Sequence, residues 1–319
     1  SGLFFLLAVI ILLAGVGIER YRRNQIPVEK MLIVGDSIGA GTGVGDYELK
    51  WYKFLPPFME EKYNVKLDIT NVSMGGNTSF AGYSRIMNLE EGSFDYVVVC
   101  YGENDRVEDF SLYYECILRA VYWRYPDSRI ITILESSQRE YTEKIETIKE
   151  LSKHYNTQIV DTIAAFNNSG IAYEELAEDG THPNEKGQQI YYEAVKDVLI
   201  KIHSEDKRED AREILPINEE VEEFRNFELY GADEFQQASE NELVLELTEV
   251  TARLGIYYTP VEGTNHIELY ADDVLVLDKE FEWEHSFVQD YIELADRQKV
   301  KFSKMRVVFD KGASCIIQV

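Results

Sequence analysis

The stretch Met31–Gly41, Met-Leu-Ile-Val-Gly-Asp-Ser-Ile-Gly-Ala-Gly, decides the fold class of this chain. Its first four residues are apolar and typical of a buried strand, and a glycine-rich loop follows at once. In an open α/β sheet, ligands and reacting groups collect at the carboxyl ends of the strands. Ser37, at such a strand end, is therefore a candidate nucleophile, provided that other loops supply a base and an oxyanion site.

The segments after this strand alternate between strand and helix patterns. Strands are predicted at 30–34, 65–72, 94–100, 129–134 and 158–161, and the third of these is wholly apolar after Asp95. Amphipathic helices are predicted at 47–63, broken or kinked by Pro56-Pro57, and at 108–125, 140–155 and 185–203, the last with Asn184 as its N-cap. This alternation is typical of a mainly parallel sheet covered by helices on both faces.

Beyond residue 204 the pattern changes. Residues 204–224 hold nine acids and three bases with almost no apolar periodicity, which indicates a linker or a solvated helix. Short strands of period two follow at 242–248, 255–259, 266–270, 274–277, 291–294 and 305–309, with turn signals at 262–265 and 310–312. They predict an antiparallel β-sandwich domain. We expect four parts: an anchor or signal segment (1–24), a catalytic domain (25–204), an acidic linker (205–224) and a β-sandwich accessory domain (225–319).

Composition excludes some classes of function. The chain has 319 residues, of which 45% are hydrophobic and 28% charged, as in a folded globular protein. Its formal net charge of −26 argues against nucleic acid as a partner, because phosphate binding needs clustered Lys and Arg. The three cysteines have no metal-ligand spacing, and Asp272-Asp273 is better explained as a solvated turn than as a calcium site.

The N-terminal segment Gly2–Ile18 is a continuous uncharged run of 17 residues. That length is at the short limit for a membrane span, and no small-residue cleavage site is obvious after it. We therefore expect an uncleaved membrane anchor with the catalytic domain outside the cytoplasm at a bacterial cell surface, or else a secreted protein. Arg20, Arg22 and Arg23 favour a cytoplasmic C-terminal side, which leaves the orientation open.

Four loops carry unusual polar sets. Gly35-Asp36-Ser37 supplies a hydroxyl, Gly75-Gly76-Asn77 a backbone that a ligand can approach closely, Gly102–Asp105 a side-chain amide, and Asp179–His182 a base with a carboxylate three residues before it. Acyl transfer needs these parts together: a hydroxyl, an imidazole to take its proton, an acid to orient the imidazole, and donors for the oxyanion. A parallel sheet would bring all four loops to one edge.

These loops resemble the four consensus blocks of the SGNH hydrolase superfamily, the GDSL-type esterases and lipases. Gly35–Ile38 resembles the first block, with Ile38 in place of the usual leucine, and Asn71–Thr78 the second, with Ser73 in place of a frequent glycine. Gly102–Asp105 resembles the third block and Asp179–Pro183 the last. The resemblance extends from Lys30 to about Ile202, and the blocks occur in the family's order.

The resemblance implies a fold, a mechanism and a set of site residues. The fold is a three-layer α/β/α sandwich around a five-stranded parallel sheet, of the SGNH, flavodoxin-like type. The catalytic residues are Ser37, His182 and Asp179, and the oxyanion hole is formed by the Ser37 N–H, the Gly76 N–H and the Asn104 amide. Asp179 is the least certain of these, because Glu178 adjoins it and some family members work with a dyad. No metal or organic cofactor is implied.

The C-terminal region resembles, more weakly, the jelly-roll modules attached to bacterial carbohydrate esterases, through the strand, acidic turn and strand of His266–Val276. Four aromatic residues are candidates for lining a substrate cleft: Trp51, Tyr83, Tyr101 and Trp123. Core packing better explains the two tryptophans.

The leading hypothesis is a membrane-anchored serine esterase that removes acetyl or another small acyl group from a carbohydrate or cell-surface glycan. Its partners would be an acylated carbohydrate or another small ester and, through residues 1–24, a membrane. Three alternatives stay open: a lysophospholipase or thioesterase, an O-acyltransferase acting on a wall polymer, and a non-catalytic glycan-binding surface protein.

Overall fold

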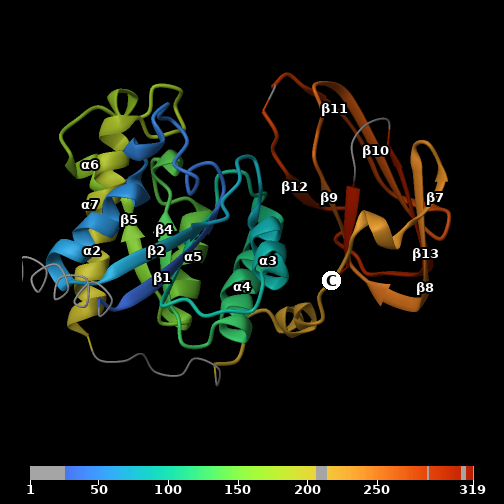
Figure 1. The fold of residues 1–319 in the computed structure, drawn as a ribbon, viewed down its shortest axis with the longest axis horizontal. Coiled ribbons are helices and arrows are strands. Elements are labelled where there is room, and N and C mark those ends of the chain that lie inside the picture. The colour runs from blue at the N-terminus through green and yellow to red at the C-terminus, as the bar shows by residue number, and fades with distance from the viewer. Residues whose placement is uncertain (1–25, 206–213, 286, 310–313, 319) are drawn as a thin grey trace, which may run out of the picture.

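A computed structural model describes residues 26–205, 214–285, 287–309 and 314–318, the last segment through its backbone. The chain forms an α/β domain followed by a β module, which lie side by side (Figure 1). The predicted fold class is confirmed: a five-stranded parallel sheet with helices, and a separate antiparallel β domain.

The five parallel strands run in the order β2-β1-β3-β4-β5. They are β1 (Val28–Gly35), β2 (Lys66–Asn71), β3 (Tyr96–Cys100), β4 (Arg129–Leu134) and β5 (Gln158–Asp161). The order reverses between β1 and β3, and such a switch point is where open α/β sheets bind ligands. Gly35 pairs with Cys100, so the first and third loops of the site leave the sheet side by side.

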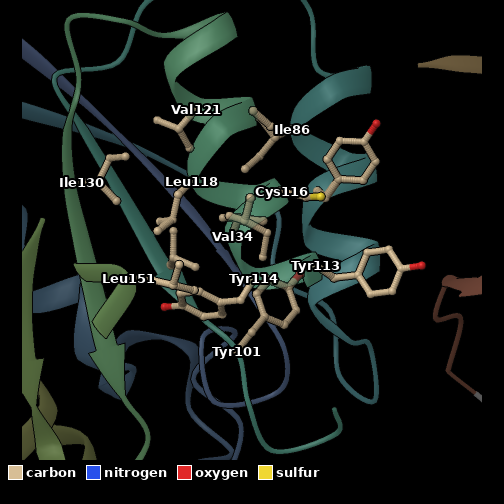
Figure 2. Close-up of a cluster of buried hydrophobic side chains, with 14 of the residues drawn as sticks. Val34, Ile86, Tyr101, Tyr113, Tyr114, Cys116, Leu118, Val121, Ile130 and Leu151 are labelled. Atoms are coloured by element: carbon tan, nitrogen blue, oxygen red, sulfur yellow. The ribbon is translucent and has the colours of Figure 1, made fainter. Parts of the chain in front are cut away.

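Three helices cover each face of the sheet. One face carries α2 (Leu55–Tyr63), α6 (Thr162–Asn168) and α7 (Glu185–Ser204), and the other α3 (Ser79–Asn88), α4 (Val107–Arg124) and α5 (Glu143–His154). Alternate residues of β1 enter the two cores: Met31 and Ile33 on the α7 face, Leu32 and Val34 on the α4 face. Figure 2 shows the second core, where Val34 lies among side chains of α3 and α4.

Three helix predictions need correction. Residues 47–63 do not form one kinked helix but two 3₁₀ turns, η1 (Tyr47–Leu49) and η2 (Trp51–Phe54), followed by α2. Pro56 and Pro57 lie in the first turn of α2, where a missing N–H costs nothing, so they start a helix instead of kinking one. Helices α3 and α6 were not predicted, and each is short, at ten and seven residues.

The β module contains two antiparallel sheets, ordered β11-β10-β13-β8-β7 and β12-β9-β14-β6. Their bounds are β6 (Glu228–Tyr230), β7 (Gln236–Ser239), β8 (Glu242–Ala252), β9 (Leu254–Tyr258), β10 (Gly263–Ala271), β11 (Val274–Trp283), β12 (Tyr291–Leu294), β13 (Val300–Phe309) and β14 (Ser314–Gln318). Several strands are longer than predicted, and Gly263–Asn265 begins β10 instead of forming a turn. The other predicted turn, 310–312, lies outside the described residues.

The described end of the acidic segment packs against the α/β domain. Residues 219–225 form the 3₁₀ helix η6, and its Val221 and Phe224 are fully buried in the core beside α4. The prediction of a solvated segment is wrong here, because these two apolar residues fall on one side of η6. Ile292 of β12 belongs to the same cluster, so one hydrophobic core spans both parts of the chain. Figure 1 shows α3 facing the module.

The predicted anchor, 2–18, lies outside the described residues. Within the described residues, no helix is long and apolar enough to span a bilayer.

Candidate active site

The loop after β1 presents Ser37 at the edge of the sheet. Asp36 is fully buried, and its Oδ1 accepts the Ile38 N–H at 2.9 Å, which turns the chain directly after the strand. The Ser37 carbonyl accepts the Thr42 N–H at 2.9 Å and closes the loop. Asp36 therefore holds the loop.

His182 lies beside Ser37, although 145 residues separate them in the chain: its Nε2 is 2.8 Å from the Ser37 Oγ. On the other side of the ring, Nδ1 is 2.7 Å from Asp179 Oδ2. Asp179 Oδ1 accepts the backbone N–H groups of Thr181 and His182, at 2.9 and 2.7 Å. These contacts form an unbroken chain from the carboxylate through the imidazole to the hydroxyl.

The charge of Asp179 fixes the proton positions along this chain. Burial raises its pKa, but hydrogen bonds from the His182 backbone, the His182 ring and Thr181 outweigh that effect and lower the pKa to about 2. Asp179 is then an ionised acceptor at neutral pH, so Nδ1 of His182 carries the proton and Nε2 presents its lone pair to Ser37. This tautomer is the one that lets an imidazole accept a serine proton.

Gln188 on α7 joins the Ser37 loop to the His182 loop. Its side chain is buried, and Nε2 donates to the carbonyls of Thr42 and Pro183, at 3.1 and 3.0 Å. The two loops also touch directly, because a Cβ on Gly43 would lie 2.3 Å from the Pro183 carbonyl oxygen. Sequence reasoning missed Gln188, and no pattern distinguishes it from other polar residues of the helix.

The second loop, Gly75–Asn77, lies on the opposite side of Ser37. A Cβ on Gly75 would be 3.5 Å from Ser37 Cβ, so this loop lies close to Ser37. Gly76 has a φ of +69°, a left-handed conformation that favours glycine. Asn77 is buried, and its side-chain amide donates to the Gly75 carbonyl at 3.1 Å.

The third loop places Asn104 between the first two. Its Nδ2 donates to Asp36 Oδ2 at 3.2 Å and to the Asn77 carbonyl at 3.0 Å. Both amide hydrogens are thus engaged with protein acceptors, so donation to an oxyanion requires one of these bonds to be exchanged. Lys144 of α5 fixes this loop, because its Nζ donates to the carbonyls of Gly102 and Asp105.

A buried pair of carboxyl groups, Asp36 and Glu135, lies under the site. Burial raises the pKa of Asp36 to about 7, and the charges of Asp105 and Glu103 add to the rise. Burial and the charge of Asp36 raise the pKa of Glu135 well above its usual range. Glu135 also accepts the Glu103 N–H at 2.8 Å, which links β4 to the third loop. Sequence reasoning missed Glu135, which follows a strand without any motif.

A cleft of about 400 Å³ opens next to Gly76 and Asn104, between the α/β domain and the β module. Six charged side chains line it, from both parts of the chain: Asp105, Arg106, Asp109, Lys279, Glu293 and Arg297. Phe80, Tyr113 and Tyr291 add aromatic surface. The aromatic residues that the sequence suggested lie elsewhere. Tyr83, Tyr101 and Trp51 are buried in the cores, and Trp123 packs against one of them.

Within the described residues, one group could hold a metal ion: His266, Glu268 and Asp278 on β10 and β11. His266 Nε2 is 2.8 Å from Asp278 Oδ1, a hydrogen bond that joins β10 to β11. None of the three residues belongs to the loops around Ser37.

The structure thus brings the predicted residues together. Ser37, His182 and Asp179 form one hydrogen-bonded chain, while Gly76 and Asn104 line one cleft beside it. Their catalytic roles stay predictions. A parallel α/β sheet with a serine, histidine and aspartate so joined at its carboxyl edge defines the class of the serine hydrolases.

Comparison with known proteins narrows this class. Residues 33–190 match the model of the GDSL-like lipase/acylhydrolase family. The chain therefore contains a GDSL/SGNH hydrolase domain followed by an antiparallel β module, and the protein is a carboxylic ester hydrolase of this family. No curated protein matches the sequence significantly.

One of the solved structures similar to this chain covers both the α/β domain and the β module. A two-domain esterase, CEX, active on acetylated mannans and co-crystallised with mannopentaose, is 16% identical, with a TM-score of 0.68 over 94% of this chain and 93% of that one. Axe2, an acetylxylan esterase from Geobacillus stearothermophilus, is 18% identical over 55% of this chain and 95% of its own, with a TM-score of 0.47. At 16% identity, the comparison with CEX establishes that the two proteins share a two-domain fold.

Proposed function

We propose that this protein is a serine esterase that removes acetyl or another small acyl group from a carbohydrate. The observation that carries the proposal is the hydrogen-bonded chain of Asp179, His182 and Ser37 beside a cleft of charged and aromatic side chains between the two domains. The three hydrogen-bonded side chains supply the chemistry, and the cleft supplies room for a polar substrate.

The reaction proceeds through an acyl-enzyme. The Ser37 Oγ attacks the ester carbonyl carbon while His182 Nε2 takes the hydroxyl proton, and Asp179 stabilises the imidazolium that forms. The N–H groups of Ser37 and Gly76 and the Asn104 amide stabilise the oxyanion. The tetrahedral intermediate expels the sugar oxygen, which takes the proton from His182. Water then attacks the acyl-enzyme with His182 as base, releases the carboxylic acid and regenerates Ser37.

The cleft favours a carbohydrate over a lipid. Six charged side chains line it, and a long acyl chain laid against them would remove their hydration without replacing it. Sugars offer hydroxyl groups to such side chains, and the aromatic faces of Tyr113 and Tyr291 suit their C–H surfaces. The shared architecture with an esterase active on acetylated mannans supports the same substrate class.

Two alternatives remain within enzymes. A lysophospholipase or thioesterase would need an apolar path for its acyl chain, which the charged cleft does not favour. An O-acyltransferase would use the same acyl-enzyme but a sugar hydroxyl in place of water, and the polar cleft suits that acceptor equally well.

The proposal includes a location. Residues 2–18 attach the protein to a membrane and place the catalytic domain outside the cytoplasm, near a glycan substrate. Fractionation of cells that produce the full chain tests it, with protease added to intact cells. The catalytic domain should be in the membrane fraction and open to cleavage from outside. Recovery in the cytosolic fraction would contradict the location and leave the chemistry untouched.

The chemistry is tested by acetate release from acetylated mannan and xylan, with p-nitrophenyl acetate and octanoate as reference esters. Replacing Ser37 by alanine should lower kcat by about 10⁴–10⁶-fold, because no other group can form the acyl-enzyme. Faster turnover of octanoate than acetate would favour the lipase alternative. Acyl transfer to an added oligosaccharide in place of acetate release would favour the transferase. Glycan retention without Ser37-dependent turnover would indicate a binding protein.

A further inference from the structure

The β module contacts the Gly75–Asn77 loop directly. Asn77 has 1% of its surface exposed, and its side chain is bound by the module on both sides: Oδ1 accepts the Ile292 N–H and Nδ2 donates to the Asp290 carbonyl, each at 3.0 Å. A buried amide left without such partners would cost about 1–3 kcal/mol. The module therefore supplies a partner to each end of this buried amide.

A second residue of the module, Gln289, reaches the same loop. Its Nε2 donates to the Gly75 carbonyl and, at 2.8 Å, to the hydroxyl of Tyr291. Both hydrogens of this amide are used, so its direction is fixed. The Tyr291 ring packs closely on the same loop, because a Cβ on Gly76 would lie 2.9 Å from it.

These contacts determine the direction of the Gly76 N–H. The Gly75 carbonyl and the Gly76 N–H belong to one peptide, and no described peptide is cis. In a trans peptide the two groups point in opposite directions. Holding the carbonyl toward the module therefore turns the N–H away from it. The two hydrogen bonds that the carbonyl accepts, from Asn77 and Gln289, also polarise the peptide and make its N–H a better donor.

We propose that the β module is part of the catalytic apparatus and that Gln289 is a positioning residue for the oxyanion hole. Gln289 holds the Gly75–Gly76 peptide so that the Gly76 N–H meets the oxyanion as it forms. This inference rests on the acyl-enzyme chemistry of the proposed function but not on its carbohydrate substrate. It means that the module does more than retain a glycan near the enzyme.

The experiment uses variants of the full chain with p-nitrophenyl acetate. Q289M keeps the length of the side chain without a donor, and Q289E keeps its shape but turns oxygen lone pairs toward the Gly75 carbonyl. Gln289 is only half-buried in a loop, so both variants should fold, and a thermal melt checks this. Q237M, at an exposed position on the edge strand β7 of the same module, is the matched control.

We expect kcat to fall about tenfold in Q289M and further in Q289E, with KM within about twofold, because loss of one complete oxyanion donor costs about 10²–10³ in rate. Q237M should keep the parent rate. A misdirected donor stabilises the transition state less but leaves the bound ester unaffected, and this produces the split between kcat and KM.

Two results would overturn the inference. The first is a kcat within twofold of the parent in both Gln289 variants. The second is a rise in KM at constant kcat, which would make Gln289 a substrate contact instead. If one variant fails to fold, the other decides. Failure of the proposed substrate class would appear separately, as absent acetate release from glycans by a parent enzyme that still hydrolyses p-nitrophenyl acetate through Ser37.

Discussion

Two loops flank Ser37, and the protein holds them in different ways. The Asp179–His182 loop is fixed within the α/β domain, by its own backbone N–H groups and by Gln188. The Gly75–Asn77 loop is fixed from outside that domain, by Gln289, Asp290 and Ile292 of the β module. The proposed nucleophile and base therefore depend on one domain, whereas the geometry of the Gly75–Asn77 loop, the proposed oxyanion loop, depends on both.

This difference distinguishes two contributions to the proposed reaction, proton transfer and oxyanion stabilisation. The proton-transfer chain of Ser37, His182 and Asp179 lies entirely within the α/β domain. Oxyanion stabilisation needs a backbone N–H in a set direction, and any part of the chain that packs on that peptide can set it. A module commonly regarded as accessory can thus belong to the site.

Within the α/β half, D179N has the largest expected effect after replacement of Ser37 itself. Two backbone N–H groups hold the Oδ1 position, so the new amide nitrogen would take the Oδ2 position and donate to His182 Nδ1. The imidazole would then carry its proton on Nε2 and could not accept one from Ser37. We expect kcat for p-nitrophenyl acetate to fall about 10³–10⁴-fold.

The control for D179N is E178Q, the neighbouring carboxylate, which binds Asn184 instead of the imidazole. It should keep the parent rate within about twofold. A loss of less than tenfold in D179N would mean that Ser37 and His182 work as a dyad.

At the boundary between the halves, G76A tests how tightly the module fits. Gly76 and Gly170 have similar φ values, +69° and +73°, so alanine at either costs about 1–2 kcal/mol of stability from the left-handed backbone alone. At Gly76 the methyl group also meets the Tyr291 ring, which is packed between Tyr258 and Trp283. We expect G76A to lower the free energy of unfolding by a further ~1–3 kcal/mol and kcat by at least about tenfold.

G170A is the control, because its methyl group meets open space. It should lose stability from the backbone effect and keep kcat. Equal losses of stability and activity in the two variants, measured by urea unfolding and by steady-state kinetics, would show that the module does not press on the oxyanion loop.

The smallest effect on activity is expected at the Asp36–Glu135 pair, which is buried in the α/β domain and whose titration acts on stability. Glu135 has a raised pKa in the folded protein. At pH values between its pKa in the unfolded protein and its pKa in the folded protein, the native state keeps a proton that the unfolded state releases. The contribution of Glu135 to stability is complete at pH values below its pKa in the unfolded protein, and it decreases as the pH rises. E135Q removes this titration and keeps the acceptor for the Glu103 N–H.

We therefore expect E135Q to gain stability relative to the parent from pH 5 to pH 8, by at most about 1.4 kcal/mol per pH unit. Urea unfolding at several pH values measures the difference. E61Q, at an exposed position on α2, should follow the parent at every pH. A constant difference between E135Q and the parent would contradict a protonated Glu135.

Much of this molecule could be predicted from sequence, because the signals are local. The apolar run of β1 and the glycines after it placed Ser37 at a sheet edge, and the spacing of Asp179 and His182 predicted their contact. Predictions failed where the determinant is not local. Helix α3 is only ten residues long and buried over most of its length, and η6 is acidic although its two apolar residues complete a core.

The sequence by itself determined the fold class and the members of the Ser37, His182 and Asp179 chain, since these depend on residue type and short-range spacing. Only the tertiary structure decided that Gln289 and Asn77 hold the oxyanion loop and that Glu135 lies beneath it. The physical reason is that a single glutamine or glutamate carries no periodic signal. What it does depends on which peptide or carboxyl group the folded chain packs against it.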